Sequence, residues 1–216
     1  IDFAFTKELV LGALCIIFSP VSRFCPDPAK EIFVKDLGIR QQIDLRNDIE
    51  AHDMIACPMN KEGVDSGNPY FVRYARLEID SYANGLDTKI YQQNIKKFFE
   101  EYVAYIDERP IYCNCYGGAD RTGTVCFLVG ALLGMSYTDL IMDYEATTFS
   151  TNFKAHDVTE AYSKFPDMVA SIKSWPFYDD KKPLKSIIET YLTDVCGVSK
   201  TTIEKIRNIM LEDPRS

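Results

Sequence analysis

The sequence predicts one α/β domain spanning residues 1–216, with a central, mostly parallel sheet flanked by helices and a helical C-terminal layer. Two observations lead to this prediction. Short apolar or alternating segments that are typical of strands alternate along the chain with amphipathic segments that are typical of helices. The composition, with 46% hydrophobic and 26% charged residues in a chain of 216, suits one globular domain with a full core.

The expected elements follow one another along the chain. We expect strands over residues 9–18, 39–46, 70–79 and 110–113, and helices over 26–38, 86–108, 121–134, 136–146, 184–195 and 201–211. The helix over 86–108 is expected to have Asp87 as its N-cap and Ile90 on its buried side. Thr201 with Glu204 has the pattern of a capping box. The polar stretch 47–69 is expected to be a long loop within the domain.

Charge and cysteine content argue against several classes of partner and site. The net charge of −8 argues against nucleic acid or an anionic membrane as a general partner. Seven cysteines without paired spacing, with only two histidines, argue against a disulfide scaffold or a zinc site. The apolar stretch 9–18 is too short to span a bilayer, so stable membrane insertion is not expected. A buried strand is favoured there over the core of a signal peptide.

The stretch 110–135, PIYCNCYGGADRTGTVCFLVGALLGM, has the pattern of a short buried strand, a glycine loop and an apolar helix. Gly117 and Gly118 allow successive backbone amides to turn towards one centre, where the start of the helix adds its own unpaired amides. Such a site suits a phosphate, and Arg121 supplies a planar fork for two of its oxygens. The same positive surroundings favour the thiolate form of Cys115, which could then attack phosphorus.

This loop resembles a known enzyme family. The pattern C-x5-R-T-G is similar to that of the cysteine-dependent protein tyrosine phosphatase superfamily, and CYGGADRTG, with Asp directly before Arg, resembles the atypical bacterial tyrosine and phosphoinositide phosphatases. The resemblance covers about residues 39–211. It implies a metal-independent hydrolase of phosphomonoesters with Cys115 as nucleophile and Arg121 as phosphate clamp, and no cofactor. Because a catalytic thiolate must stay reduced, the cytoplasm is favoured as its location, although an exported form is an open alternative.

Further residues receive expected roles from this comparison. The backbone amides of residues 116–121, among them Tyr116, Gly117, Gly118 and Ala119, would hold phosphate oxygens. The Thr122 hydroxyl would donate a hydrogen bond to the Cys115 sulfur. Cys113 is expected to point into the sheet, and a role as redox partner of Cys115 is the alternative.

The general acid has more than one candidate. Asp120 has the position of the loop aspartate in the bacterial branch and is the first choice, with a loop-stabilising role as its alternative. Asp80, on the loop before the long helix, is the rival, and Asp87 is a weaker one. Residues 44–46, DLR, resemble the segment that supports the phosphate loop in the bacterial phosphatases. Asp44 and Arg46 would therefore support the site, and an ordinary surface ion pair is the alternative.

Two positions depart from the family pattern and bear on the substrate. Asn114 stands where histidine usually precedes the nucleophile, and Ala119 stands where phosphoinositide phosphatases tend to carry lysine. The loop therefore favours a monophosphate, and phosphotyrosine in a protein or peptide is the preferred substrate. A phosphoinositide or inositol phosphate substrate is the enzymatic alternative. A pseudophosphatase that binds phosphate without turnover is the other alternative.

Overall fold

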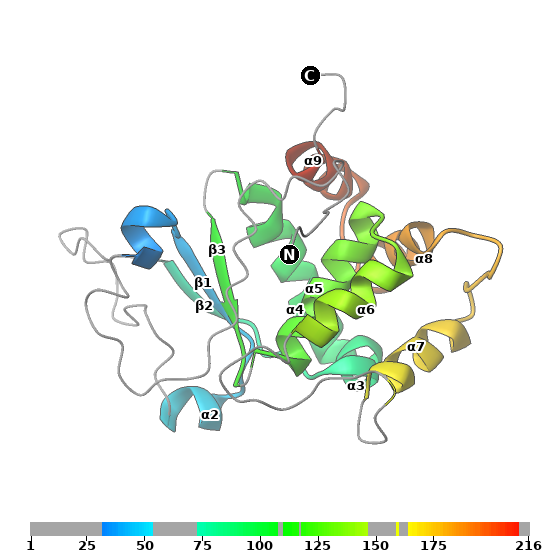
Figure 1. Ribbon diagram of the computed structural model, residues 1–216, viewed down its shortest axis with the longest axis horizontal. Coiled ribbons are helices and arrows are strands. Elements are labelled where there is room, and N and C mark those ends of the chain that lie inside the picture. Colours follow the sequence, from blue (N-terminus) through cyan, green and yellow to red (C-terminus); the bar gives the residue numbers. More distant parts are fainter. Residues whose placement is uncertain are drawn as a thin grey trace.

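The computed structural model describes residues 32–53, 73–107, 110–116, 118–146, 159 and 164–211 (Figure 1). Within them three strands form a parallel sheet in the order β2-β1-β3. These are β1 (Gln41–Asp44), β2 (Arg73–Arg76) and β3 (Ile111–Asn114). They confirm the expected strands over 39–46, 70–79 and 110–113; β1 and β2 are shorter than expected, and β3 has the expected length but starts one residue later. The strand expected over 9–18 lies outside the described residues.

The register of the sheet brings three strand ends to one edge. Asp44, the last residue of β1, lies opposite Arg76 of β2 on one side and Asn114 of β3 on the other. Since all three strands are parallel, the loops that follow them start at the same edge. Every residue of β1 and β3 is buried, as expected for the interior of a parallel sheet.

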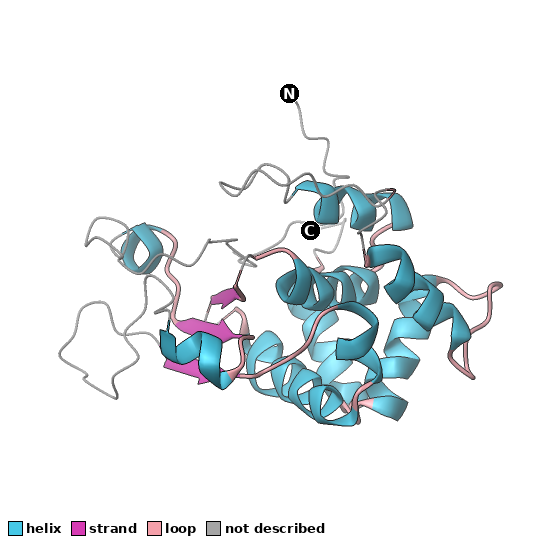
Figure 2. Cartoon of the chain, turned by 90° about the horizontal axis from the view of Figure 1, so that it is seen from below, coloured by secondary structure: helices cyan, strands magenta, loops and turns pink. Residues whose placement is uncertain are grey.

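The remaining described elements are helical and lie mostly on one side of the sheet (Figures 1 and 2). They are a π-helical turn at Ile32–Asp36, α2 (Asp48–Asp53), α3 (Tyr82–Asp87), α4 (Lys89–Lys97), α5 (Asp120–Leu133), α6 (Tyr137–Glu145), α7 (Phe165–Ser174), α8 (Leu184–Thr190) and α9 (Lys200–Met210). Further π or 3₁₀ turns extend α4 over Phe98–Tyr102 and Val103–Tyr105, and α8 over Tyr191–Val195. The structure is therefore the expected α/β fold with a helical C-terminal layer.

Helix α5 is the central helix of the core. Ten of its residues are buried, and it contacts α3, α6 and α8. It begins just after β3 and ends at Gly134, whose φ of 93° is a left-handed conformation that favours glycine. In the parts of the chain that the structure describes, no helix has the length and apolar character needed to cross a membrane.

The segment before the long helix differs from the prediction. Tyr82–Asp87 forms the short helix α3, where a loop was expected, and Thr88 rather than Asp87 is the N-cap of α4. The Asp87 carboxylate instead accepts hydrogen bonds from Ser171 and Trp175 of the α7 region. Ile90, expected to be buried, is 56% exposed. Tyr91 is partly buried against the core, and Ile95 is the residue of α4 that is fully buried.

The cap of the last helix also differs. Ser199, not Thr201, is the N-cap of α9, and its hydroxyl accepts the backbone N–H of Thr202. Thr201 and Glu204 therefore do not form the expected capping box. Both serine and threonine fit an N-cap, and Ser199 has that role here while Thr201 is already within the helix.

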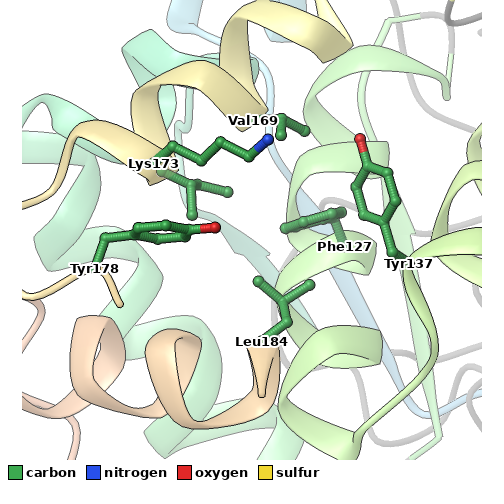
Figure 3. A pocket seen from close by; sticks show the side chains of 7 residues that line it. Phe127, Tyr137, Val169, Lys173, Tyr178 and Leu184 are labelled. Atoms are coloured by element: carbon green, nitrogen blue, oxygen red, sulfur yellow. The ribbon is translucent and has the colours of Figure 1, made fainter. Parts of the chain in front are cut away.

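An apolar pocket of about 220 Å³ lies between α5, α6, α7 and α8 (Figure 3). Phe127, Ile172 and Leu184 give it apolar walls, while Tyr137 and Lys173 stand at its edge. Phe127 and Tyr137 also lie beside the buried ring of Phe165, which in turn packs on Tyr144 at 4.9 Å between ring centroids. This aromatic cluster supports the side of α5 away from the sheet.

We predict that Gly85→Ala destabilises the fold. A Cβ atom at Gly85 would clash with the backbone carbonyl of Asp80, because α3 folds back closely over the residues that lead into it. We expect a loss of about 1–3 kcal/mol in the free energy of unfolding, measured by urea denaturation. Gly123→Ala in α5 is the control, since its Cβ would make only an ordinary 3.8 Å contact with Tyr144. Equal effects of the two changes would contradict the prediction.

Candidate active site

Cys115 follows β3 directly and lies at the base of the glycine loop. It is 2% exposed, and its Sγ accepts the backbone N–H of Gly118 at 3.2 Å. Gly118 has a φ of 76°, a left-handed conformation that turns this N–H back towards the sulfur. The strand, the loop and the first turn of α5 thus place the thiol group in front of a helix N-terminus.

Arg121, in the first turn of α5, is held by Glu50 of α2. Its two terminal nitrogens donate to the two carboxylate oxygens of Glu50 at 2.5 and 2.8 Å. This hydrogen bonding raises the pKa of Arg121, and the nearby Cys115 and Asp80 act in the same direction. The bidentate pair uses the end of the guanidinium, and within the described residues no side chain or carbonyl accepts from its Nε.

Glu50 was missed by the sequence prediction, which placed a long loop over 47–69. The first part of that stretch is helix α2, and residues 54–72 lie outside the described structure. Asn47 and Glu50 form a reciprocal cap, with the Glu50 N–H donating to Asn47 Oδ1 at 2.9 Å and the Asn47 N–H donating to Glu50 Oε2 at 3.3 Å. The spacing Asn-x-x-Glu is a capping-box pattern and could have identified this helix.

A buried ion pair lies beneath the loop. Arg46 donates to both oxygens of Asp44, from Nε at 2.8 Å and from Nη2 at 2.6 Å, and neither side chain is exposed. Burial alone would raise the pKa of Asp44, but the hydrogen bonds and charge of Arg46 leave it below the ordinary value. Arg46 also donates to the Glu50 carbonyl at 3.2 Å, so the pair helps to place α2. A surface ion pair, the alternative from the sequence, is therefore wrong.

Asn114, which stands where the superfamily usually has histidine, belongs to the same network. Its Oδ1 accepts from Gln42 at 2.8 Å, and its Nδ2 lies 3.4 Å from Asp44 Oδ1. Asn114 is buried, and these hydrogen bonds link β1 to the end of β3, directly before Cys115. Next to it, Cys113 is buried in the sheet, and burial raises the pKa of its thiol well above the ordinary value. Cys113 accordingly stays protonated inside the sheet.

Both candidate acids lie near this site but have different partners. The Asp120 carboxylate accepts a hydrogen bond of 2.5 Å from the hydroxyl of Tyr82, the first residue of α3. The Asp80 carboxylate accepts from the backbone N–H of Ser81 at 2.7 Å and from the side-chain amide of Asn84. Asp80 is therefore bound to Ser81, the N-cap of α3, and to Asn84 within that helix, while Asp120 is bound to α3 through Tyr82. No sequence signal pointed to Tyr82.

Comparison with known proteins identifies the family. The profile described as the tyrosine phosphatase family matches residues 25–212. The chain belongs to this tyrosine phosphatase family. A comparison with curated proteins gives no match. Among solved structures, the chain is similar to the core catalytic domain of the PP-IP phosphatase SIW14 from S. cerevisiae, determined in complex with citrate, with 15% identity, a TM-score of 0.44, and coverage of 91% of this chain and 96% of that chain. At these values the similarity does not bear on substrate.

The remaining residues that were expected to bind substrate lie in the loop after Cys115 and at the start of α5. Tyr116 is 51% exposed at the top of the loop, and Ala119 is buried at the start of α5. Gly117 lies outside the described residues. The Thr122 hydroxyl is buried and makes no hydrogen bond within the described part of the chain, so the expected bond to Cys115 is not formed. The amide of Gly118 contacts the sulfur instead.

We predict that Asp44→Asn destabilises this phosphatase strongly. The change leaves the buried Arg46 without its counter-charge, at a cost of about 3–5 kcal/mol in the free energy of unfolding. Denaturant unfolding measures the loss. Asp48→Asn is the matched control, because Asp48 pairs with Arg76 at the surface and is 82% exposed, and such pairs contribute about 1 kcal/mol or less.

The same ion pair predicts a pH effect. Since the folded chain lowers the pKa of Asp44 below 3.8, the pair stabilises the fold above that pH and loses its contribution as the pH falls through the lower folded value. We expect wild-type stability to fall in this acidic range and the fall to be smaller in Asp44→Asn. The same acid dependence in both proteins would contradict this.

Proposed function

We propose that the chain hydrolyses phosphomonoesters through a phosphocysteine intermediate, with Cys115 as nucleophile, Arg121 as phosphate clamp and Asp120 as general acid. The observation that carries this proposal is the convergence of three groups at one sheet edge. The Cys115 sulfur faces the amide of Gly118, the Arg121 guanidinium is held beside it by Glu50, and the first turn of α5 starts there. Membership of the tyrosine phosphatase family supports it.

The chemistry takes place in two steps. In the first, the Cys115 thiolate attacks phosphorus, the S–P bond forms, the ester P–O bond breaks, and Asp120 gives its proton to the leaving oxygen. In the second, water attacks phosphorus, the S–P bond breaks, and the Asp120 carboxylate takes a proton from the water. Arg121 and the loop amides stabilise the charge on the equatorial oxygens, the role that a bound cation has in other phosphoryl transfers.

Glu50 decides how Arg121 can bind phosphate. A guanidinium has two forks for an anion, one between its terminal nitrogens and one that includes Nε. Glu50 uses the first fork, which leaves the second for two oxygens of the substrate phosphate. Glu50 is thus a positioning residue for Arg121, and the Asp44–Arg46 pair supports it through the Glu50 carbonyl.

We propose phosphotyrosine in a protein or peptide as the substrate. Ala119 and the other described loop residues before Asp120 bring no cationic side chain for additional phosphates, which disfavours a polyphosphorylated ring. Tyr116, half exposed at the top of the loop, offers an aromatic face to a phenyl ring. Phosphoinositides and inositol phosphates are the comparison substrates in the tests below.

We predict that hydrolysis of para-nitrophenyl phosphate is unaffected by EDTA and is abolished in Cys115→Ser. Serine has the same shape, but its hydroxyl is not ionised near neutral pH, so the nucleophile is lost. Asp120→Asn is expected to reduce kcat by roughly a hundredfold or more and to remove the basic limb of the pH profile. A phosphotyrosine peptide is expected to be a better substrate than inositol phosphates by kcat/KM.

Other outcomes would change the assignment. Full activity of Cys115→Ser would refute the thiolate mechanism. Binding of vanadate without turnover in the wild-type protein at any pH from 4 to 8 would indicate a pseudophosphatase. If Asp120→Asn keeps the basic limb of the pH profile and Asp80→Asn loses it, Asp80 is the acid.

We also predict that Glu50→Gln weakens phosphate binding by Arg121. Glutamine keeps the size of the side chain but removes the charge and one acceptor oxygen, and the misplaced guanidinium is expected to lower kcat/KM by roughly a hundredfold. Vanadate affinity should fall as well. Glu189→Gln is the control. Glu189 of α8 pairs with Arg207 of α9 at 2.8 Å, and this pair is about as exposed as the pair of Glu50 with Arg121. Equal activity in the two variants would contradict a positioning role.

A further inference from the structure

Tyr82 binds the Asp120 carboxylate more closely than an ordinary hydrogen bond. Its hydroxyl lies 2.5 Å from Asp120 Oδ1, a length typical of a hydroxyl donating to a charged carboxylate. The same hydroxyl lies 3.0 Å from that of Tyr144. Because the Tyr82 proton is given to Asp120, Tyr144 must donate to Tyr82, so the three groups form a directed chain from α6 through α3 to α5.

The Tyr82 hydroxyl remains a donor at every pH of interest. Burial raises the pKa of Tyr82 far above the ordinary value of 10.0, and the hydrogen bond to Asp120 raises it further. Its ring packs edge to face against Tyr144, with centroids 6.2 Å apart, and Tyr144 in turn packs on Phe165. The tyrosine therefore has neither a second ionisation state nor free space in which to turn away.

The backbone of Tyr82 is also fixed, at some cost. Its φ of 55° makes it the one non-glycine residue with a positive φ in the described structure, a conformation that bulky side chains rarely adopt. The N–H of Tyr82 donates to Thr124 Oγ1 at 2.8 Å, and that hydroxyl donates to the Asp120 carbonyl at 2.8 Å. Tyr82 is thus attached to the first two turns of α5, by its side chain to Asp120 and by its main chain to Thr124. Strained residues of this kind cluster at functional sites.

We propose that Tyr82 is a positioning residue for the general acid. Its hydroxyl binds Oδ1 of Asp120, so that the acid proton is carried by Oδ2 and the carboxylate left after proton transfer keeps a strong donor. Within the described residues nothing donates to Oδ2, which is therefore the oxygen open to the leaving group. This inference rests on the proposed role of Asp120 and assigns a partner on α3 to it.

The test is the dependence of rate on the leaving group. Good leaving groups such as 2,4-dinitrophenolate depart without a proton, whereas phenolate needs one, so only the latter depends on a well-placed acid. We expect Tyr82→Phe to lower kcat/KM for phenyl phosphate by roughly tenfold or more and to leave that for 2,4-dinitrophenyl phosphate nearly unchanged. A steeper plot of log kcat/KM against leaving-group pKa across a series of aryl phosphates is the signature.

Two further variants separate positioning from general support of α3. Tyr191→Phe removes another buried hydroxyl that binds the same helix, at the Leu86 carbonyl with a distance of 2.7 Å. It is expected to lower thermal stability without changing the leaving-group dependence. Thr124→Val keeps the Tyr82 hydroxyl but removes the acceptor of its N–H, and we expect a steeper leaving-group dependence here too. If Tyr82→Phe does not fold by circular dichroism, Thr124→Val decides the test.

The outcomes distinguish this inference from the proposed function. If Asp120→Asn leaves the leaving-group dependence unchanged, Asp120 is not the acid and the proposed function fails at that point. If Asp120→Asn makes it steeper and Tyr82→Phe lowers all rates equally or none, Asp120 remains the acid and the role of Tyr82 is overturned. A steeper dependence in Tyr191→Phe equal to that in Tyr82→Phe would also overturn it.

Discussion

The bidentate ion pair between Arg121 and Glu50 joins the two halves of the site. Glu50 lies 71 residues before Arg121 in the chain, on a helix that follows a different strand. Without this contact, the guanidinium would have several long rotamers and its Nε fork would have no fixed direction. The position of the Arg121 guanidinium therefore depends on a short helix, α2, that has six residues and cannot be stable alone.

The place of α2 depends in turn on a charged group that is fully buried. Arg46 binds Asp44 through two hydrogen bonds and still reaches the Glu50 carbonyl, while Tyr74 donates to Asp44 Oδ2 at 2.9 Å. A buried ion pair of this kind adds little net stability compared with apolar residues, because desolvation of both charges offsets their attraction. What it provides is a single geometry at the end of β1. Asn114 brings the end of β3 into the same network, a task that needs hydrogen bonds but no positive charge.

The sequence predicted those parts of the site that are encoded locally. The strand, loop and helix around Cys115 and Arg121 could be read from spacing alone, because glycine, the buried strand and the apolar helix are all short-range signals. Helix α3 could not, since Asn84 and Gly85 have low helix propensity and Tyr82 is held in its conformation by Thr124, 42 residues away. Glu50 and Tyr82 contact Arg121 and Asp120 through pairs that are distant in sequence and that no spacing rule describes. The cap at Asn47 was visible in the sequence and was overlooked.

The three carboxylates near Cys115 differ in their hydrogen-bond partners, and the difference bears on the proposed general acid. Arg121 holds the pKa of Glu50 below its usual value of 4.5, so Glu50 stays ionised. Both oxygens of Asp80 accept hydrogen bonds, one from the backbone N–H of Ser81 and the other from the side-chain amide of Asn84. Among the described residues, the Asp120 carboxylate has a single donor, the Tyr82 hydroxyl, on one oxygen. Protonation of its other oxygen breaks no hydrogen bond in the described structure and removes one negative charge next to the phosphate. This difference in hydrogen bonding supports the proposal that Asp120, rather than Asp80, is the acid.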